Sequence, residues 1–249
     1  MPAAPASWLL PPLLLTGVVA ATLLGGFFAI RFRGRMPLIM GFTAGVLIGL
    51  VSFDLLPEII RRIGDAKLDP RAMMAALAAG FLAFHTLEKL IVIHHGAVGG
   101  PEERKHPRVG VLSALALCGH SFMDGVSIGL GFQIGRGVGL IVAFAVISHD
   151  FIDGMNTVVV MINNRNTARE TVPYLILNSC IPVLGLLSTS FLRLPPSALV
   201  LYLSFFSGFL LYIGASHILP EAHRDGSSVW TVLLTIFGAA LSFALSAFV

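Results

Sequence analysis

Charged residues are scarce in this chain of 249 residues, at 12% of the composition. A soluble domain of this size carries roughly 25%. Hydrophobic residues make up 56% and the mean hydropathy is +0.88, which excludes an ordinary soluble globular protein and favours a lipid bilayer as solvent. The net charge is only +3, with no basic stripe outside short connectors, so nucleic-acid binding is not expected.

Cysteine is also scarce, and the N-terminal part of the sequence has no basic residues. The two cysteines, Cys118 and Cys180, lie inside apolar segments and form no C-x-x-C pair, so no disulfide framework is expected. No Lys or Arg precedes Arg31. Because a cleavable signal peptide needs a basic stretch before its apolar core, the first apolar segment is predicted to remain as a membrane span.

Apolar segments make up most of the chain, and each approaches the roughly 20 residues that cross the hydrocarbon core. Lipid requires helices there, because every backbone polar group must be satisfied internally. The sequence therefore predicts an all-α membrane protein. Its eight transmembrane helices would form a bundle that is a single transmembrane domain over residues 1–249. The predicted spans cover residues 8–30, 37–60, 73–93, 109–133, 138–162, 171–192, 197–219 and 229–249.

Basic residues in the connectors predict the orientation, because cytoplasmic loops carry an excess of Lys and Arg. An even number of spans puts both termini on one side. The larger set of basic residues then belongs to the cytoplasmic connectors, which places both termini outside. The nine residues of the larger set are Arg31, Arg33, Arg35, Arg104, Lys105, Arg108, Arg165, Arg169 and Arg224, against Arg61, Arg62, Lys67, Arg71, Arg136 and Arg193 in the other.

One motif, H-x-F-x-D-G, occurs in two adjacent spans. Residues 120–125 read HSFMDG and residues 149–154 read HDFIDG. In each copy a His and an Asp four residues apart share one helix face. Both copies lie near the middle of an apolar run, where ionisable groups are costly and usually functional. The glycine after each Asp, Gly125 or Gly154, would let a neighbouring helix approach closely.

The two spans run in opposite directions, so His120 is expected at the level of Asp153, and Asp124 at the level of His149. Two imidazoles and two carboxylates would then converge at the membrane midplane, a donor set suited to Zn²⁺, with Fe²⁺, Mn²⁺ or Co²⁺ as alternatives. Each His could instead hydrogen-bond within its own helix and only pack. Burying four ionisable groups without a function is costly, which favours the metal site.

Ser121 and Asp150 directly follow the two histidines and point about 100° away from them on a helix. Either could belong to an adjacent second metal site or could hydrogen-bond to a neighbouring helix. The charge of Asp150 favours the metal site, whereas the neutral Ser121 favours the hydrogen bond.

A second repeat, L-P-E, closes the second and seventh spans. A cation would meet carboxylates at the entrance, the His/Asp site midway and His with Glu at the exit. The alternative is that these polar residues only mark the membrane interface. The repetition also suggests an internal repeat, as in many transporters. The candidate pathway residues are Asp54 and Glu58 near the outer surface, and His217, Glu221 and His223 near the inner surface.

With these residues in place, the chain resembles the ZIP family of divalent-metal transporters over essentially its whole length. That family has eight transmembrane helices, inverted repeats and both termini outside. Its signatures on the fourth and fifth helices are H-N-x-P-E-G and an H-E/Q-x-P-E-G-like run, to which HSFMDG and HDFIDG correspond. The runs LLPE at residues 55–58 and SHILPEAHR at residues 216–224 are also similar.

The resemblance implies a function and its residues. The chain would be a multi-pass protein of the cell membrane, not an enzyme, that moves a divalent cation into the cytoplasm by alternating access. Zn²⁺ would be its substrate, with Fe²⁺, Mn²⁺, Co²⁺ or Cd²⁺ as alternatives; the lipid bilayer would be its other partner, and a homodimer is left open. The implied residues are the primary ligands His120, Asp124, His149 and Asp153, the second-site positions Ser121 and Asp150, and the pathway residues Asp54, Glu58, His217, Glu221 and His223.

The sequence departs from the family signature at the site itself. Both signature glutamates are aspartates here, about one methylene shorter, and the usual Asn is Ser121, a weaker ligand. Where many members carry Glu before a proline of the sixth helix, this chain has Ile181 before Pro182, with Asn178 the nearest polar residue. One metal ion is therefore expected rather than two, and the preferred metal could differ from zinc.

Two other functions fit parts of the pattern. Cation diffusion facilitators, which export metal, also place His and Asp four residues apart on two helices, but they have six spans and a soluble metal-binding domain. An intramembrane metallohydrolase needs a metal-bound water and a general base. The zinc-protease motif H-E-x-x-H is absent, since Ser121 follows His120 and Asp150 follows His149. Metal import is thus the expected function, with export and hydrolysis as alternatives.

Overall fold

A computed structural model describes residues 10–32, 35–64, 66–96, 107–224, 226 and 228–246. All regular structure in these ranges is helical. In chain order the elements are α1 (Leu10–Arg31), α2 (Met36–Leu50), the π-helix η3 (Val51–Leu55), α3 (Leu56–Ile63), α4 (Pro70–Gly96), α5 (Pro107–Ile134), α6 (Arg136–Asn163), α7 (Ala168–Ser188), the short 3₁₀ turn η4 (Thr189–Phe191), α8 (Pro196–Leu211), the π-helix η5 (Tyr212–Ile218), α9 (Leu219–Ala222) and α10 (Val229–Ser246).

The helices coincide closely with the apolar segments of the sequence. Elements α2, η3 and α3 follow one another without a break, as do α8, η5 and α9. Within the described ranges, seven helical stretches are long and apolar enough to cross a membrane. Helix α4 has 27 residues, which is also enough to span, although its second half is more polar. The expected all-helical membrane bundle is therefore confirmed.

The L-P-E repeat is also a structural repeat. Pro57 and Pro220 have no N–H to donate to the carbonyl four residues earlier, and the turn before each L-P-E is π-helical, η3 in one case and η5 in the other. Helix α3 contacts α8 while α2 contacts α9, so the two helices are antiparallel and the π turns lie towards opposite ends of the bundle. In both copies the Glu pairs with an arginine three residues later, Glu58 with Arg61 at 2.7 Å and Glu221 with Arg224 at 2.5 Å.

Glycines define the closest helix crossings. Where α1 crosses α6, a Cβ on Gly25 would lie 1.8 Å from the carbonyl oxygen of Phe151, and a Cβ on Gly154 would lie 1.9 Å from that of Thr22. Backbone at these distances leaves no room for a side chain, so this crossing requires glycine on both helices. The same reciprocal arrangement occurs at three further crossings of the described helices: Gly125 with Gly185 between α5 and α7, Gly80 with Gly208 between α4 and α8, and Gly45 with Gly238 between α2 and α10.

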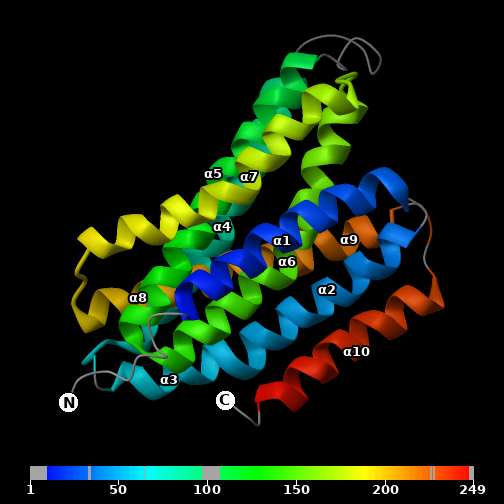
Figure 1. Ribbon diagram of the computed structural model, residues 1–249. Coiled ribbons are helices and arrows are strands. Elements are labelled where there is room, and N and C mark those ends of the chain that lie inside the picture. Colours follow the sequence, from blue (N-terminus) through cyan, green and yellow to red (C-terminus); the bar gives the residue numbers. More distant parts are fainter. Residues whose placement is uncertain are drawn as a thin grey trace.

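These crossings join the helices in four pairs, and the contacts between the pairs group them into two units (Figure 1). The α5–α6 unit contains α1, α5, α6 and α7; the α4–α8 unit contains α2, η3, α3, α4, α8, η5, α9 and α10. Figure 1 shows α5 beside α7 in the first and α2 beside α10 in the second. Between the units, α6 packs on α2 and α5 packs on α8. In the described ranges no reciprocal glycine crossing joins one unit to the other.

Candidate metal centre

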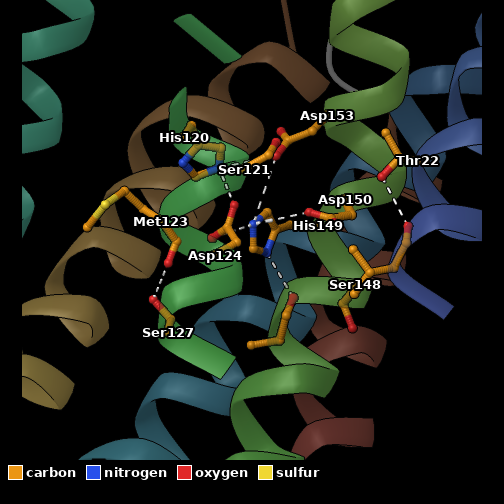
Figure 2. Close-up of polar contacts among 12 residues, drawn as sticks. Thr22, His120, Ser121, Met123, Asp124, Ser127, Ser148, His149, Asp150 and Asp153 are labelled. Atoms are coloured by element: carbon orange, nitrogen blue, oxygen red, sulfur yellow. Dashed lines mark hydrogen bonds and ion pairs between the residues drawn. The ribbon is translucent and has the colours of Figure 1, made fainter. Parts of the chain in front are cut away.

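The two H-x-F-x-D-G motifs face each other across the α5–α6 contact. His120 and Asp124 extend from α5, while His149 and Asp153 extend from α6 (Figure 2). All four side chains are buried, and one ligand atom from each lies within 4.8 Å of the others. The antiparallel arrangement of neighbouring helices thus brings together four donors that are up to 33 residues apart in the sequence (from position 120 to 153).

The distances between donors match the size of a metal site. His120 Nε2 lies 3.1 Å from Asp153 Oδ2 and 3.3 Å from Asp124 Oδ2. His149 Nε2 lies 3.4 Å from Asp124 Oδ1 and 3.9 Å from Asp153 Oδ2. Zn–N and Zn–O bonds of about 2.0–2.2 Å, arranged tetrahedrally, place the ligand atoms about 3.3–3.6 Å apart. These distances are close to that range, but with one ligand atom from each residue the separations extend up to 4.8 Å, so binding one ion would draw the donors closer together.

Several atoms at the centre of this group have no hydrogen-bond partner within the described structure. They include both carboxylate oxygens of Asp124, Oδ2 of Asp153 and Nε2 of His149, all of them buried. A buried polar atom without a partner costs about 1–3 kcal/mol, and charged groups are the more costly case. Buried polar atoms that converge on one point and lack hydrogen-bond partners are suited to binding a cation, which would satisfy them together.

The two histidines are oriented by different contacts. His149 Nδ1 donates to the carbonyl of Ala145, one turn earlier, at 2.8 Å. This bond fixes the ring and leaves Nε2 for the centre, as is usual for metal-binding histidines. His120 Nδ1 is buried without a hydrogen-bond partner in the described structure. Instead, the rings of Phe84 and Phe209 pack on His120, with centroids 5.3 Å and 4.8 Å from its own.

Ser121 belongs to a neutral hydrogen-bond chain beside the group. Its Oγ donates to Asn178 Oδ1 at 2.8 Å, and Asn178 Nδ2 donates to Thr157 Oγ1 at 3.2 Å. Thr157 Oγ1 in turn donates to the carbonyl of Asp153 at 2.8 Å. Of the two roles that the sequence leaves open for Ser121, the structure shows the hydrogen bond to a neighbouring helix, α7.

Asp150 has a different environment. It is fully buried on α6, and neither of its carboxylate oxygens has a hydrogen-bond partner in the described structure. Its Oδ1 lies 3.8 Å from His149 Nε2. Asp150 is thus as close to His149 as Asp153 Oδ2 is, at 3.9 Å, but it does not belong to the group whose ligand atoms all lie within 4.8 Å of one another.

A cavity of about 380 Å³ reaches His120 and is also lined by His217 of η5. Asn156 and Asn163 line it further along α6, and Asn164 lines it directly after that helix, towards the end of the bundle where α6 finishes. Asn156 and Asn163 follow His149 by seven and fourteen residues, so they share its helix face. These asparagines are not among the residues predicted from the sequence, although the spacing of Asn156 and Asn163 from His149 is a signal that points to them.

The remaining candidate pathway residues lie elsewhere. Asp54 lines a separate cavity of about 340 Å³, together with Ser242 of α10 and residues of α6. Glu58 and Glu221 line neither cavity and are engaged in their ion pairs with arginine. The Nδ1 atom of His223 is buried and has no hydrogen-bond partner in the described part of the chain. Of the five candidates, His217 is the one that shares a cavity with His120.

A helical membrane bundle with converging buried imidazoles and carboxylates defines a class: multi-pass membrane proteins that handle divalent cations. Residues 97–249, more than half of the chain, match the family model of the ZIP zinc transporters. The chain therefore belongs to the ZIP family, whose members are divalent-metal transporters rather than enzymes. The matched range contains α5 and α6 and hence the whole His/Asp group. A comparison with curated proteins gave no match.

Proposed function

We propose that this protein imports a divalent cation, preferably Zn²⁺, through a site formed by His120, Asp124, His149 and Asp153. The supporting observation is the convergence of four buried donors whose ligand atoms lie within 4.8 Å of one another, with contacts as short as 3.1 Å and 3.4 Å, since Zn²⁺ takes four such N and O ligands. Two imidazoles with two carboxylates suit a borderline cation better than Mg²⁺ or Ca²⁺, which prefer oxygen donors throughout.

Transport by alternating access is supported by the arrangement of the two units. Within each unit, reciprocal glycine contacts join the helices in pairs, and the pairs pack on each other, as α5 does on α6. In the described ranges the contact between the units contains no reciprocal glycine crossing. The metal ligands all belong to the α5–α6 unit, so a shift of that unit along the other would move the site as a whole. The cavity beside His120 extends towards the connector after α6, which is cytoplasmic when both termini lie outside.

Flux measurements test this function. Purified protein in liposomes is expected to admit Zn²⁺ and Cd²⁺ fastest in a series that includes Fe²⁺, Mn²⁺ and Co²⁺, with protein-free liposomes as the control. Cells that express the protein should accumulate the preferred metal. A net loss of metal from those cells would support export instead, and liposomes no more permeable than the protein-free control would contradict transport.

We also propose that the site binds one cation rather than two. The bonds from Ser121 through Asn178 to Thr157 satisfy the polar groups beside the site with neutral partners. A second ion there would have to break this chain.

Metal stoichiometry distinguishes the two cases. Equilibrium dialysis with Zn²⁺ is expected to give one ion per chain for the wild-type protein and for Ser121→Ala. The affinity of Ser121→Ala should stay within about threefold of the wild type, because a neutral hydrogen bond contributes only about 1 kcal/mol. Two ions per wild-type chain, falling to one in Ser121→Ala, would show that Ser121 is a ligand.

A further inference from the structure

We infer that Phe84 and Phe209 are positioning residues that hold the His120 imidazole in its metal-binding orientation. Because these rings belong to the α4–α8 unit and His120 to the α5–α6 unit, they make the affinity of the site depend on how the two units are placed. The inference rests on the proposed function of the same His/Asp site.

The contrast between the two histidines leads to this inference. His149 is oriented by a carbonyl of its own helix, that of Ala145, so its orientation is kept wherever α6 moves. His120 has no such bond within the described structure, because its Nδ1 is buried without a partner. Apart from the carboxylates of the site and the His149 ring at 5.6 Å, the rings of Phe84 and Phe209, at 5.3 Å and 4.8 Å, are the ring contacts that limit its rotation in the described structure.

The two phenylalanines are themselves firmly placed. Their rings meet edge to face, with centroids 4.8 Å apart and an interplanar angle of 82°, a favourable geometry for aromatic pairs. The buried Tyr212 packs on Phe84 at 5.5 Å and 65°, and its hydroxyl lies 3.2 Å from His85 Nδ1. His120 therefore packs against an ordered aromatic cluster and not against mobile side chains.

Close backbone contact between α4 and α8 sets the position of this cluster. A Cβ on Gly80 would lie 1.9 Å from the carbonyl oxygen of Phe205, and a Cβ on Gly208 would lie 1.9 Å from that of Leu77. Phe84 is one turn after Gly80, and Phe209 is adjacent to Gly208. The crossing thus presents both rings to His120 as parts of one rigid surface of the α4–α8 unit.

Phe84 also separates the metal site from an apolar cavity. Together with Leu87 it lines both the 380 Å³ cavity at His120 and a second cavity of about 170 Å³. The second cavity is lined mostly by apolar side chains of α4 and α8, with Met123 and Ser127 from α5. Truncation of Phe84 would join these spaces and leave one side of the imidazole without packing. Loss of this ring should therefore affect His120 more than His149.

Metal binding to the purified full-length protein tests the inference. In Phe84→Ala and Phe209→Ala the Kd for Zn²⁺ is expected to rise about tenfold, the lower end of what outer contacts of metal ligands contribute. The visible d–d absorption of bound Co²⁺ should change as well, since it reports ligand geometry. Phe84→Tyr keeps a ring of similar shape and should restore both measurements. Phe205→Ala is the matched control on α8, because Phe205 lines the apolar cavity and makes no ring contact with His120 in the described structure.

The outcomes separate this inference from the function on which it rests. A Kd and Co²⁺ spectrum unchanged in Phe84→Ala and Phe209→Ala, with binding lost in His149→Ala, would overturn the positioning role alone. Wild-type binding in His149→Ala would overturn the site itself. If the alanine variants fold poorly, Phe209→Leu provides the same test with most of the volume retained: a changed Co²⁺ spectrum supports positioning, and a wild-type spectrum contradicts it.

Discussion

Replacing His149 with alanine is expected to abolish metal uptake, and Asp153→Ala should do the same. His149 is fully buried, its Nδ1 is bonded to Ala145, and its Nε2 faces the carboxylates of Asp124 and Asp153. Loss of a direct ligand should weaken Zn²⁺ binding by more than the roughly 10–100-fold that follows loss of an outer hydrogen bond. Tracer flux into proteoliposomes and Zn²⁺ titration of the purified variants measure the two effects.

Ser148→Ala is the matched control for these variants. Ser148 precedes His149 on α6, and its Oγ donates to the carbonyl of Phe144 on the same helix at 2.7 Å. Its removal should leave uptake within about twofold of the wild type, because Ser148 is not a ligand of the proposed site. Substitutions outside the core and outside caps or buried polar networks change stability by only about 0.5 kcal/mol. Full uptake in both His149→Ala and Asp153→Ala, or equal loss in Ser148→Ala, would contradict the site assignment.

Gly125→Ala, which adds a single methyl group, is expected to destabilise the protein strongly. A Cβ at Gly125 would lie 1.9 Å from the carbonyl oxygen of Pro182. A backbone carbonyl cannot relieve such a clash by changing rotamer, as a side chain can. Helices α5 and α7 would have to separate, so the loss should reach or exceed the roughly 1–3 kcal/mol typical of overpacking. Thermal unfolding in detergent measures it as a lowered midpoint.

The same helix supplies the control for this prediction. Gly119 also lies in α5, and a Cβ there would meet no heavy atom within 4 Å. Gly119→Ala should therefore be neutral or stabilising by up to about 1 kcal/mol, because alanine is the better helix former. Equal midpoints for the two variants would show that close packing of α5 on α7 contributes little to stability.

The helices could be predicted from the sequence because the signal for them is local. A membrane span depends on the length and apolarity of one segment, and these are visible in the residues themselves. The pairing of His with Asp is equally local, since four residues make one helical turn. The sequence alone thus determined the all-helical membrane class and the four residues that face each other, His120, Asp124, His149 and Asp153.

The tertiary structure decided what surrounds those residues. Ser121 and Asn178 are 57 residues apart, and Phe84 and Phe209 both meet His120 from other helices. The distance between such positions along the sequence does not predict that they meet. Which helices pack together in lipid depends on the small residues, such as glycine, that allow two backbones to approach closely. The neutral chain at Ser121, the aromatic contact that orients His120 and the division into two units therefore became visible only once the helices were packed.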